Sequence, residues 1–423
     1  MATSYLWPGI YVEEQSTGAR VIEAVGTSTA AFVGVAPAGG QRVNERVPIR
    51  SWTDFVNVFV EEGSKSTDLA HAVYGFFNNG GRYCYVVNVG AGGQLVGNAT
   101  GGRKGLALLE EADDVSIVAA PGYTDPASYD AVISHAESMR DRIAILDSAA
   151  GVTDQRALIK VGTATASAPA SRRREGGGRA AGDGGDAAAA GGGTAAAPPT
   201  VDAARPRVSD AGFAAFYAPQ ITVRDPLDPR SLVNVYPSGH IAGIYSRCDS
   251  TRGVHKAPAN EVIRGAVEVA YRFTNDEQGA LNQNGVNAIR FFSGEGIRVY
   301  GARTLAASSS EWKYVNVRRL FIMIEQSIAR NTKWVVFEPN NRSLWKAIRR
   351  DVSAFLRTVW RDGALVGRTP EEAFFVKCDE ETNPPDSIDA GRVVIVIGIA
   401  PAKPAEFVIF GIGQTASGAA IEA

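Results

Sequence analysis

Histidine and cysteine are the side chains best suited to bind a metal or act as a nucleophile, and this chain of 423 residues has few of them. None of its four His lies in an HxxxH or HExxH pattern: His71, His135, His240 and His255. The three Cys are widely spaced and form no CxxC: Cys84, Cys248 and Cys378. A zinc site needs three or four ligands that converge. We therefore expect no metal, no cofactor and no disulfide framework.

Two glycine-rich loops and two carboxylate pairs have residue types that occur in catalytic or phosphate-binding sites, but their patterns do not fit. Gly97–Gly102 has the GxxxxG spacing of a P-loop, but Arg-Lys-Gly follows where Lys-Ser/Thr is required. The sequence Ser293–Gly296 indicates a turn and contains no GxSxG nucleophile elbow. The pairs at 113–114 and 371–372 stand in loop or helix-start positions, where carboxylates act as caps. We expect the chain not to be an enzyme.

Length and charge exclude several classes of protein. A chain of this length suggests two or three domains, and 45% hydrophobic with 21% charged residues is typical of a packed globular protein. The 43 Lys and Arg against 45 Asp and Glu give a net charge of −2, which argues against a general nucleic-acid or membrane-surface binder. The longest apolar run, Val393–Ile397, cannot span a bilayer, and Met1–Pro8 does not resemble a signal peptide. We expect no direct membrane insertion and synthesis in a reducing cytosol.

A low-complexity segment interrupts the chain at 162–206, where 25 of 45 residues are Ala or Gly. Val201 is its one large apolar side chain, so the segment cannot bury enough surface to offset the entropy lost on ordering. We expect a disordered surface insertion. Its Arg172–Arg174 run suits a solvated loop better than a basic interaction tag.

Hydrophobic periodicity predicts a strand–helix–strand unit before this insertion. The run at 114–120 is typical of a buried strand, 126–140 has apolar residues on one helical face, and 142–147 is a second buried strand. This order indicates parallel strands. Four earlier elements form an α/β region of their own: a strand at 29–35, helices at 51–60 and 68–78, and a strand at 82–89.

Two long helices, at 318–331 and 341–361, stand out after the insertion. Six strand-like runs accompany them: 289–292, 297–300, 333–337, 373–378, 391–400 and 406–413. The second helix has one acidic residue, Asp351, against six basic ones: Arg342, Lys346, Arg349, Arg350, Arg357 and Arg361. This face is either a solvated outer surface or a basic surface that docks on an acidic partner.

Both ends of the chain are apolar and β-prone, although chain termini are usually polar and frayed. Ile10–Glu14 and Val21–Val25 stand near the start, and Phe407–Ile412 stands near the end. Such segments join a sheet in their own chain or in a neighbour's. When each copy gives a strand to the next copy in the same head-to-tail way, the contacts build an open helical lattice.

Many short motifs, in the right order, resemble the contractile tail sheath family of phage tails, R-type tailocins and extracellular contractile injection systems. The resemblance covers about 1–90 and 210–413. Its residues in the first part are Pro8–Glu14, Arg20–Ile22, Val25–Ser28 and Ala31–Gly34. Those in the second part are Pro237–Gly243, Gly253–Asn260, Leu281–Asn282, Gly285–Asn287, Gly301–Leu305, Tyr314–Leu320, Phe337–Asn340, Cys378–Asp379, Thr382–Asn383, Ala400–Pro401 and Pro404–Phe407.

The resemblance implies an α/β (α+β mixed) fold, with an inner sheath domain of mixed sheet plus helices built from both chain halves. An outer α/β domain is inserted into it, and extended N- and C-terminal arms flank it. We expect an N-terminal arm at 1–28, the first part of the inner domain at 29–95 and the outer domain at 96–215. The C-terminal sheath domain follows at 216–404, and the C-terminal strand and tail at 405–423.

The resemblance also implies a function: a structural subunit that polymerises helically around an inner tube and contracts from a metastable extended state to drive the tube through a target envelope. The inter-subunit strands would contain Ile10, Tyr11, Val12, Glu13, Phe407, Val408, Ile409 and Phe410. Thr17-Gly18 and Pro401–Pro404 would act as swivels. The tube-facing residues would be Lys346, Arg349, Arg350 and Arg357. Asn260, Arg303 and Arg318 are expected to be buried structural polar groups rather than contraction-switch contacts.

Two other functions stay open at this point. The chain could be a baseplate or other tail component that shares the inner-domain fold, or an unrelated α/β enzyme. The expected partners of a sheath subunit are further copies of itself, the inner tube protein, and baseplate and terminal cap proteins, without nucleic acid. The particle would assemble in the bacterial cytoplasm and stay there, be released, or form part of a virion.

Overall fold

The computed structural model describes residues 21–97, 102–162, 203–407 and 409, which belong to two compact units. The smaller unit contains the described residues 21–25 and 323–402, and the larger unit contains the rest. Helix α7 (Val315–Asn331) has residues in both units. In the part of the chain that the structure describes, no helix has the length and apolar character needed to cross a membrane.

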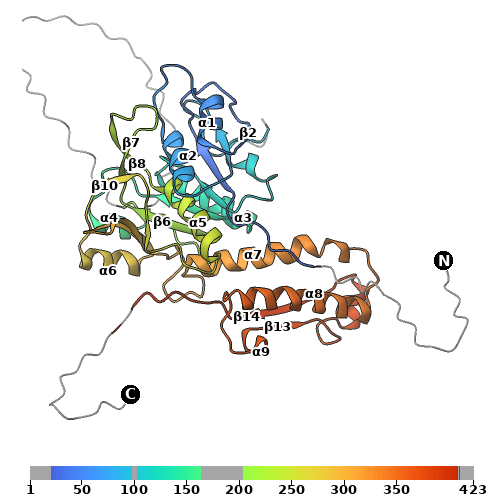
Figure 1. Cartoon of the computed structure of the whole chain (residues 1–423). Helices are drawn as coiled ribbons and strands as arrows, with labels where there is room; N and C mark the ends of the chain where they lie inside the picture. Colours follow the sequence, from blue (N-terminus) through green and yellow to red (C-terminus); the bar gives the residue numbers. More distant parts are fainter. Residues whose placement is uncertain (1–20, 98–101, 163–202, 408, 410–423) are drawn as a thin grey trace, which may run out of the picture. The chain divides into compact units, whose positions relative to one another are not determined.

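The larger unit is built on a nine-stranded mixed sheet in the order β2-β3-β1-β4-β5-β6-β11-β12-β9 (Figure 1). The six strands from β3 to β11 run parallel. At the two sides, β2 pairs antiparallel with β3, β12 with β11, and β9 with β12. The strands are β1 (Ala30–Gly34), β2 (Arg46–Ile49), β3 (Cys84–Asn88), β4 (Ile117–Ala119), β5 (Ile143–Asp147), β6 (Ala214–Ala218), β9 (Glu261–Val262), β11 (Val286–Phe292) and β12 (Gly296–Tyr300).

Helices cover both faces of this sheet, so its central strands are buried throughout. In β1, Ala30 and Phe32 belong to one core, and Ala31 and Val33 belong to the other. Burial on both faces is why the parallel strands are continuous apolar runs. The first core includes α1 (Trp52–Phe59), α2 (Asp68–Asn78) and α5 (Ser238–Arg252). The second includes α3 (Pro126–Met139), α4 (Gln155–Ile159), α6 (Asn275–Gln283) and a 3-10 helix at Leu106–Leu109.

A separate three-stranded antiparallel sheet in the order β10-β7-β8 adds to the first core. Its strands are β7 (Ile221–Arg224), β8 (Leu232–Val235) and β10 (Ala266–Val269). Each contributes buried apolar residues to that core, namely Ile221, Val223, Val235 and Val269.

The smaller unit combines helices with a two-stranded antiparallel sheet. Besides its part of α7, it contains a 3-10 helix (Lys333–Val335), α8 (Arg342–Arg361), α9 (Pro370–Ala373) and α10 (Pro385–Asp389). Its sheet pairs β13 (Phe374–Lys377) with β14 (Val396–Ile399). Asn341 caps α8, because its side-chain oxygen accepts hydrogen bonds from the backbone N–H groups of Ser343 and Leu344.

Several predicted elements are confirmed by the structure. Helix α2 occupies the predicted residues 68–78, and α1 at Trp52–Phe59 lies within the predicted helix 51–60. The parallel pairing of β4 with β5 confirms the strand–helix–strand unit. The chain is a mixed α/β protein, as expected.

The predicted strand at Lys333–Phe337 is wrong. Residues 333–335 form a 3-10 helix, and Phe337 follows with a backbone φ of 70°. The run is β-prone, but it connects two helices directly and pairs with no strand among the described residues. Of the predicted strand at 406–413, the described residues 406, 407 and 409 have no strand assignment, and the others lie outside the described residues.

Candidate functional site

Five of the seven His and Cys side chains are buried: His71, His240, Cys84, Cys248 and Cys378. No group of three or more His, Cys, Asp or Glu among those residues is placed to hold a metal ion. Burial raises the pKa of the Cys84 thiol well above its usual range, which disfavours the nucleophilic thiolate. The Ser293–Gly296 segment is the turn between β11 and β12. The remaining candidates are two exposed surfaces and the anchored ends of the described chain.

The basic face of α8 is the first candidate surface. Its opposite, buried face consists of Leu344, Trp345, Ile348, Val352, Phe355, Leu356 and Val359. The predicted residues Lys346, Arg349, Arg350 and Arg357 are all exposed. Their spacings of three, four and seven residues place them on one side of the helix. Within this group, the Arg350 Nε donates to Asp351 Oδ1 at 2.9 Å, so most of the positive charge faces outward.

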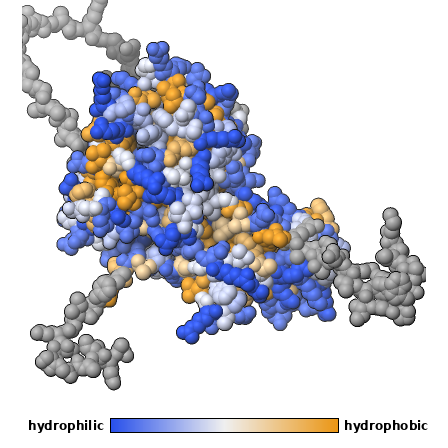
Figure 2. Space-filling view, in the orientation of Figure 1, coloured by the Kyte–Doolittle hydropathy of each residue, from blue (hydrophilic) through white to orange (hydrophobic). Residues whose placement is uncertain are grey.

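The β13–β14 sheet is the second candidate surface. No third strand pairs with either strand among the residues that the structure describes. Phe375 and Val396 are 56% and 43% exposed, and Figure 2 shows apolar patches among hydrophilic residues in this part of the surface. A two-stranded sheet with unpaired edges is marginally stable by itself and accepts further strands.

The start of the described chain is anchored separately in each unit. In the smaller unit, the Val25 N–H donates to Ser327 Oγ at 3.0 Å, and Asn331 Nδ2 donates to the Glu23 carbonyl at 3.1 Å. In the larger unit, Arg319 donates to the Thr27 carbonyl at 2.9 Å. Each of these bonds joins a backbone group of residues 23–27 to a side chain of α7. The predicted strand residues Ile10, Tyr11, Val12 and Glu13 lie outside the described residues.

A buried ion pair holds this anchor in the larger unit. Arg319 donates to both carboxylate oxygens of Asp249, at 2.8 and 2.5 Å, and the Thr27 hydroxyl donates to Asp249 Oδ2 at 2.6 Å. The side chains of Arg319 and Asp249 are 3% and 5% exposed. Two-pronged bonds between charged groups are among the strongest polar contacts in proteins. The segment before β1 is therefore fixed to α5 and α7.

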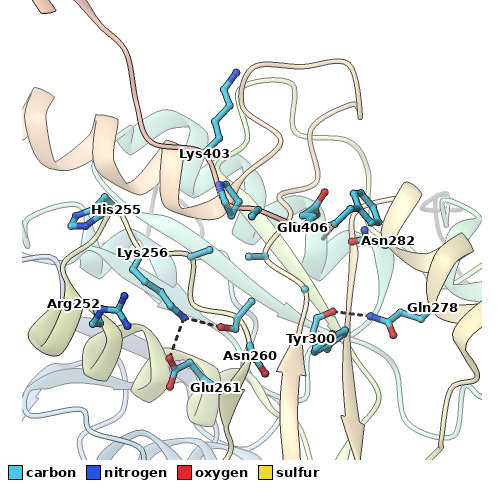
Figure 3. A pocket seen from close by; sticks show the side chains of 17 residues that line it. Arg252, His255, Lys256, Asn260, Glu261, Gln278, Asn282, Tyr300, Lys403 and Glu406 are labelled. Carbon is cyan, nitrogen blue, oxygen red and sulfur yellow. Dashed lines mark hydrogen bonds and ion pairs between the residues drawn. The ribbon is translucent and has the colours of Figure 1, made fainter. Parts of the chain in front are cut away.

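The end of the described chain crosses the larger unit at a cavity of about 940 Å³. Residues 403–407 form one wall, and the others come from the 255–261 loop after α5, from α6 and from residues 300–302 at the end of β12. Figure 3 shows Glu406 beside Asn282 and Lys403 directed away from the cavity. Lys256 Nζ bonds Glu261 Oε1 at 3.1 Å within it. Phe407, which lines the cavity, is 74% exposed, and Ile409 after it is 91% exposed. Val408 and Phe410 lie outside the described residues.

At this cavity, Glu406 accepts three hydrogen bonds from two side chains. Arg303 donates from Nε to Oε1 at 2.8 Å and from Nη2 to Oε2 at 2.6 Å, and the Tyr314 hydroxyl donates to Oε2 at 3.2 Å. Burial opposes the negative charge, but the bonds from Arg303 outweigh it, so the pKa of Glu406 lies below its ordinary value. The carboxylate is therefore charged at neutral pH.

Two of the three predicted structural polar groups are buried, and one is not. Arg303 and Arg318 are 8% and 4% exposed, and the guanidinium of Arg318 lies 3.5 Å from the Trp312 ring centroid. Asn260 is exposed at a cavity edge, where a left-handed φ of 58° lets its carbonyl accept from Arg298. The prediction of burial is wrong for Asn260, because this loop turns at the surface.

Sequence reasoning missed the pairing of Arg303 with Glu406 and of Arg319 with Asp249. Arg303 and Glu406 are 103 residues apart, and Arg319 and Asp249 are 70 apart. Three of the four residues belong to or adjoin motifs that carried the family resemblance. The available signal was a single charged residue in a short motif of mostly uncharged residues, such as Glu406 in Pro404–Phe407, because a charge in such a place needs a partner.

Comparisons with known proteins agree with each other. Residues 98–305 match the family model of the phage tail sheath protein central domain, and residues 307–415 match that of the phage tail sheath C-terminal domain. The tail sheath protein of Salmonella phage ViI is 34% identical over 167 residues, which are 38% of this chain and 25% of that protein. The tail sheath protein of Enterobacteria phage T4 is 28% identical over 182 residues, 42% of this chain and 27% of that protein. The chain thus spans about a quarter of the length of these curated relatives.

Solved structures match over nearly the whole chain. The helical sheath of the anti-feeding prophage (AFP) in its contracted state has a TM-score of 0.69 and 27% identity, covering 97% of this chain and 100% of that chain. The contracted sheath complex of PVC, an extracellular contractile injection system, has a TM-score of 0.68 and 26% identity, covering 98% and 99%. A chain of the AFP baseplate structure has a TM-score of 0.68 and 27% identity, covering 97% and 100%.

Proposed function

This chain belongs to the contractile phage tail sheath family, and we propose that it is a structural subunit that polymerises helically around an inner tube and contracts to drive that tube through a target envelope. The family is structural and non-enzymatic. The observation that carries the proposal is the agreement with contracted AFP and PVC sheath subunits along almost the full length of the chain. The protein is part of a phage tail or tail-like particle.

The β13–β14 sheet suits the role of acceptor for strands from neighbouring copies. It has two strands, unpaired edges among the described residues, and exposed apolar side chains. We propose that Ile10–Glu13 of one neighbour and Phe407–Phe410 of another add to it. Backbone ladder bonds hold such a joint while the flanking linkers turn, so subunits stay connected when their other contacts change.

The domain division predicted from sequence remains part of this proposal. The arms would be 1–28 and 405–423, the inner domain 29–95 and 216–404, and the outer domain 96–215. The role of the Ala/Gly-rich insertion is not assigned. A tube protein, a baseplate and a terminal cap would be the partners, in addition to further copies of the chain.

Removal of residues 1–20 tests strand exchange. We expect the full chain to form long hollow helical tubes, alone or with a co-expressed inner tube protein, and the shortened chain to stay unassembled. The arm would supply most of the backbone bonds between neighbours, so we expect at least a tenfold loss of tubes in negative-stain electron microscopy. The control is replacement of residues 163–182 by a Gly/Ser linker of equal length, which should leave tubes intact.

Two outcomes would contradict the proposal. Tubes of normal length from the shortened chain would overturn strand exchange by the N-terminal arm. A full chain that forms no tubes even with an inner tube protein, but associates with baseplate proteins, would favour the baseplate alternative, which the match to a chain of the AFP baseplate structure also supports.

Reversing the charge of the α8 basic face tests its proposed contact with the tube. In the triple variant Lys346→Glu, Arg349→Glu and Arg350→Glu, we expect at least a tenfold weaker association with an acidic inner tube, measured by co-sedimentation at low and high salt. Electrostatic attraction between surfaces falls as salt rises, so the difference should shrink at high salt. The matched control reverses three exposed basic residues of the larger unit: Lys65, Arg82 and Arg230. Normal tube binding by the α8 variant would refute the contact.

A further inference from the structure

The C-terminal segment is hydrogen-bonded to the rest of the chain at two places, residues 400–402 and Glu406, and is exposed after Glu406. Residues 400–402 are bonded within the smaller unit, where the Val366 N–H donates to the Ala400 carbonyl and the Ala402 N–H donates to the Ala364 carbonyl. Glu406 is bonded within the larger unit to Arg303 and Tyr314. Only three residues, 403–405, connect these bonded positions. The exposed apolar residues Phe407 and Ile409 follow directly.

Arg303 is itself held firmly by the central sheet. Its backbone N–H donates to Asn287 Oδ1 at 2.7 Å, and Asn287 Nδ2 donates to the carbonyls of Phe216 in β6 and Arg303, at 3.1 and 2.8 Å. The Nη1 atom of Arg303 donates to the Asn282 carbonyl at 3.0 Å. Gly301 leaves room for this arrangement, since a Cβ there would lie 2.8 Å from Asn287 Oδ1. A continuous chain of hydrogen bonds therefore joins Glu406 to the buried strands.

The ion pair between Arg303 and Glu406 is largely shielded from solvent, which strengthens it. The side chains of Arg303 and Glu406 are 10% and 18% exposed, and the guanidinium binds both carboxylate oxygens. Charge-assisted, two-pronged bonds of this kind are short and direction-specific. Removal of one partner would also leave the other with an unpaired charge.

We propose that Arg303 clamps Glu406 and makes Phe407 the point where the C-terminal arm leaves the larger unit. In this view, Pro401–Pro404 is not a free swivel. The arm turns after residue 406, and tension from a neighbouring copy passes through Glu406, Arg303 and Asn287 into the nine-stranded sheet. The mechanical role rests on the proposed sheath function, whereas the clamp itself is a property of the single chain.

A glutamate-specific endoproteinase tests the clamp on the unassembled full chain. The enzyme cuts after Glu406 only when that side chain is free to enter its active site. The released fragments 407–423 and 407–422 are quantified together by mass spectrometry, because the enzyme also cuts after Glu422. The reference is a synthetic peptide of residues 400–415, in which Glu406 has no partner. We expect the native chain to be cut there at least tenfold more slowly than the peptide, and Arg303→Ala to approach the peptide rate.

Two further variants make the result specific. Tyr314→Phe removes one of the bonds to Glu406 and should give an intermediate rate. Arg272→Ala breaks an exposed ion pair with Glu268, whose side chains are 64% and 60% exposed, and should leave the rate unchanged. If Arg303→Ala does not fold, as judged by circular dichroism, the native chain, the peptide and Tyr314→Phe still decide the question.

The clamp is overturned if the native chain is cut after Glu406 as fast as the peptide, or if Arg303→Ala folds and is cut no faster than the native chain. Neither measurement requires tubes. Failure of the chain to polymerise would therefore count against the proposed function and leave the clamp result standing.

Discussion

Asp249→Ala is expected to lower the free energy of unfolding by about 3–5 kcal/mol, because it leaves the Arg319 guanidinium buried without its anion. Arg319 is 3% exposed, and its main partners are the two oxygens of Asp249 and the Thr27 carbonyl. The Thr27 hydroxyl also loses its acceptor. The loss is a large fraction of the 5–15 kcal/mol that typically separates folded from unfolded domains.

The measurement is urea unfolding of the native chain and the variant at pH 7. Glu268→Ala is the matched control, because its exposed pair with Arg272 should contribute less than about 1 kcal/mol. We also expect faster hydrogen exchange at residues 26–29 in Asp249→Ala, since the bonds that hold this segment to α5 and α7 are lost. Equal stability of Asp249→Ala and Glu268→Ala would show that the buried pair is not an anchor.

Asp147→Asn is expected to stabilise the protein, by an amount that grows with pH. Asp147 ends β5, is 3% exposed, and accepts a hydrogen bond from the Ser238 N–H at the start of α5 at 2.7 Å. Burial raises the pKa of Asp147 to about 7, against an ordinary value of 3.8, although the bonds from Ser238 oppose this shift. Between these two values the folded state holds a proton that the unfolded state has released, so the free energy of unfolding falls as pH rises.

Asparagine has nearly the same shape and no proton to lose. The variant's advantage over the native chain should therefore increase by about 2–3 kcal/mol between pH 5 and pH 8, at about 1.4 kcal/mol per pH unit up to the folded-state pKa. Urea unfolding at both pH values measures this difference, and any constant effect of the amide cancels. An advantage that stays constant or shrinks with pH would mean that Asp147 is ionised in the folded protein near pH 5.

Elements with a strong local pattern could be predicted from the sequence. The apolar pattern of residues 68–78 predicts helix α2, and the structure gives it the same first and last residues. Helix α8 separates apolar from basic positions clearly, and Asn341 marks its start. Ordered short motifs carried the family resemblance, and some of them contain a glycine that the fold requires, such as Gly253 with a φ of 94° and Gly301 close to Asn287.

Helix α5 could not be predicted from its residue pattern, since it is buried on nearly every side and has no polar stripe. Its glycines follow from its neighbours: a Cβ at Gly239 would lie 2.1 Å from the Ala72 carbonyl oxygen in α2. The turn at Phe337 also depends on context, because a β-prone run becomes a strand only where another strand is available to pair with it.

What the sequence by itself determined is local: periodicity, caps, turns and the order of motifs along the chain. The tertiary structure decided which distant residues come into contact, and the candidate anchors depend entirely on such contacts. Arg303 could pair with Glu406, and Arg319 with Asp249, only because the fold brings together residues that are 103 and 70 positions apart in the chain. A charged side chain can bind any opposite charge, so only the packing of the surrounding apolar faces selects its partner.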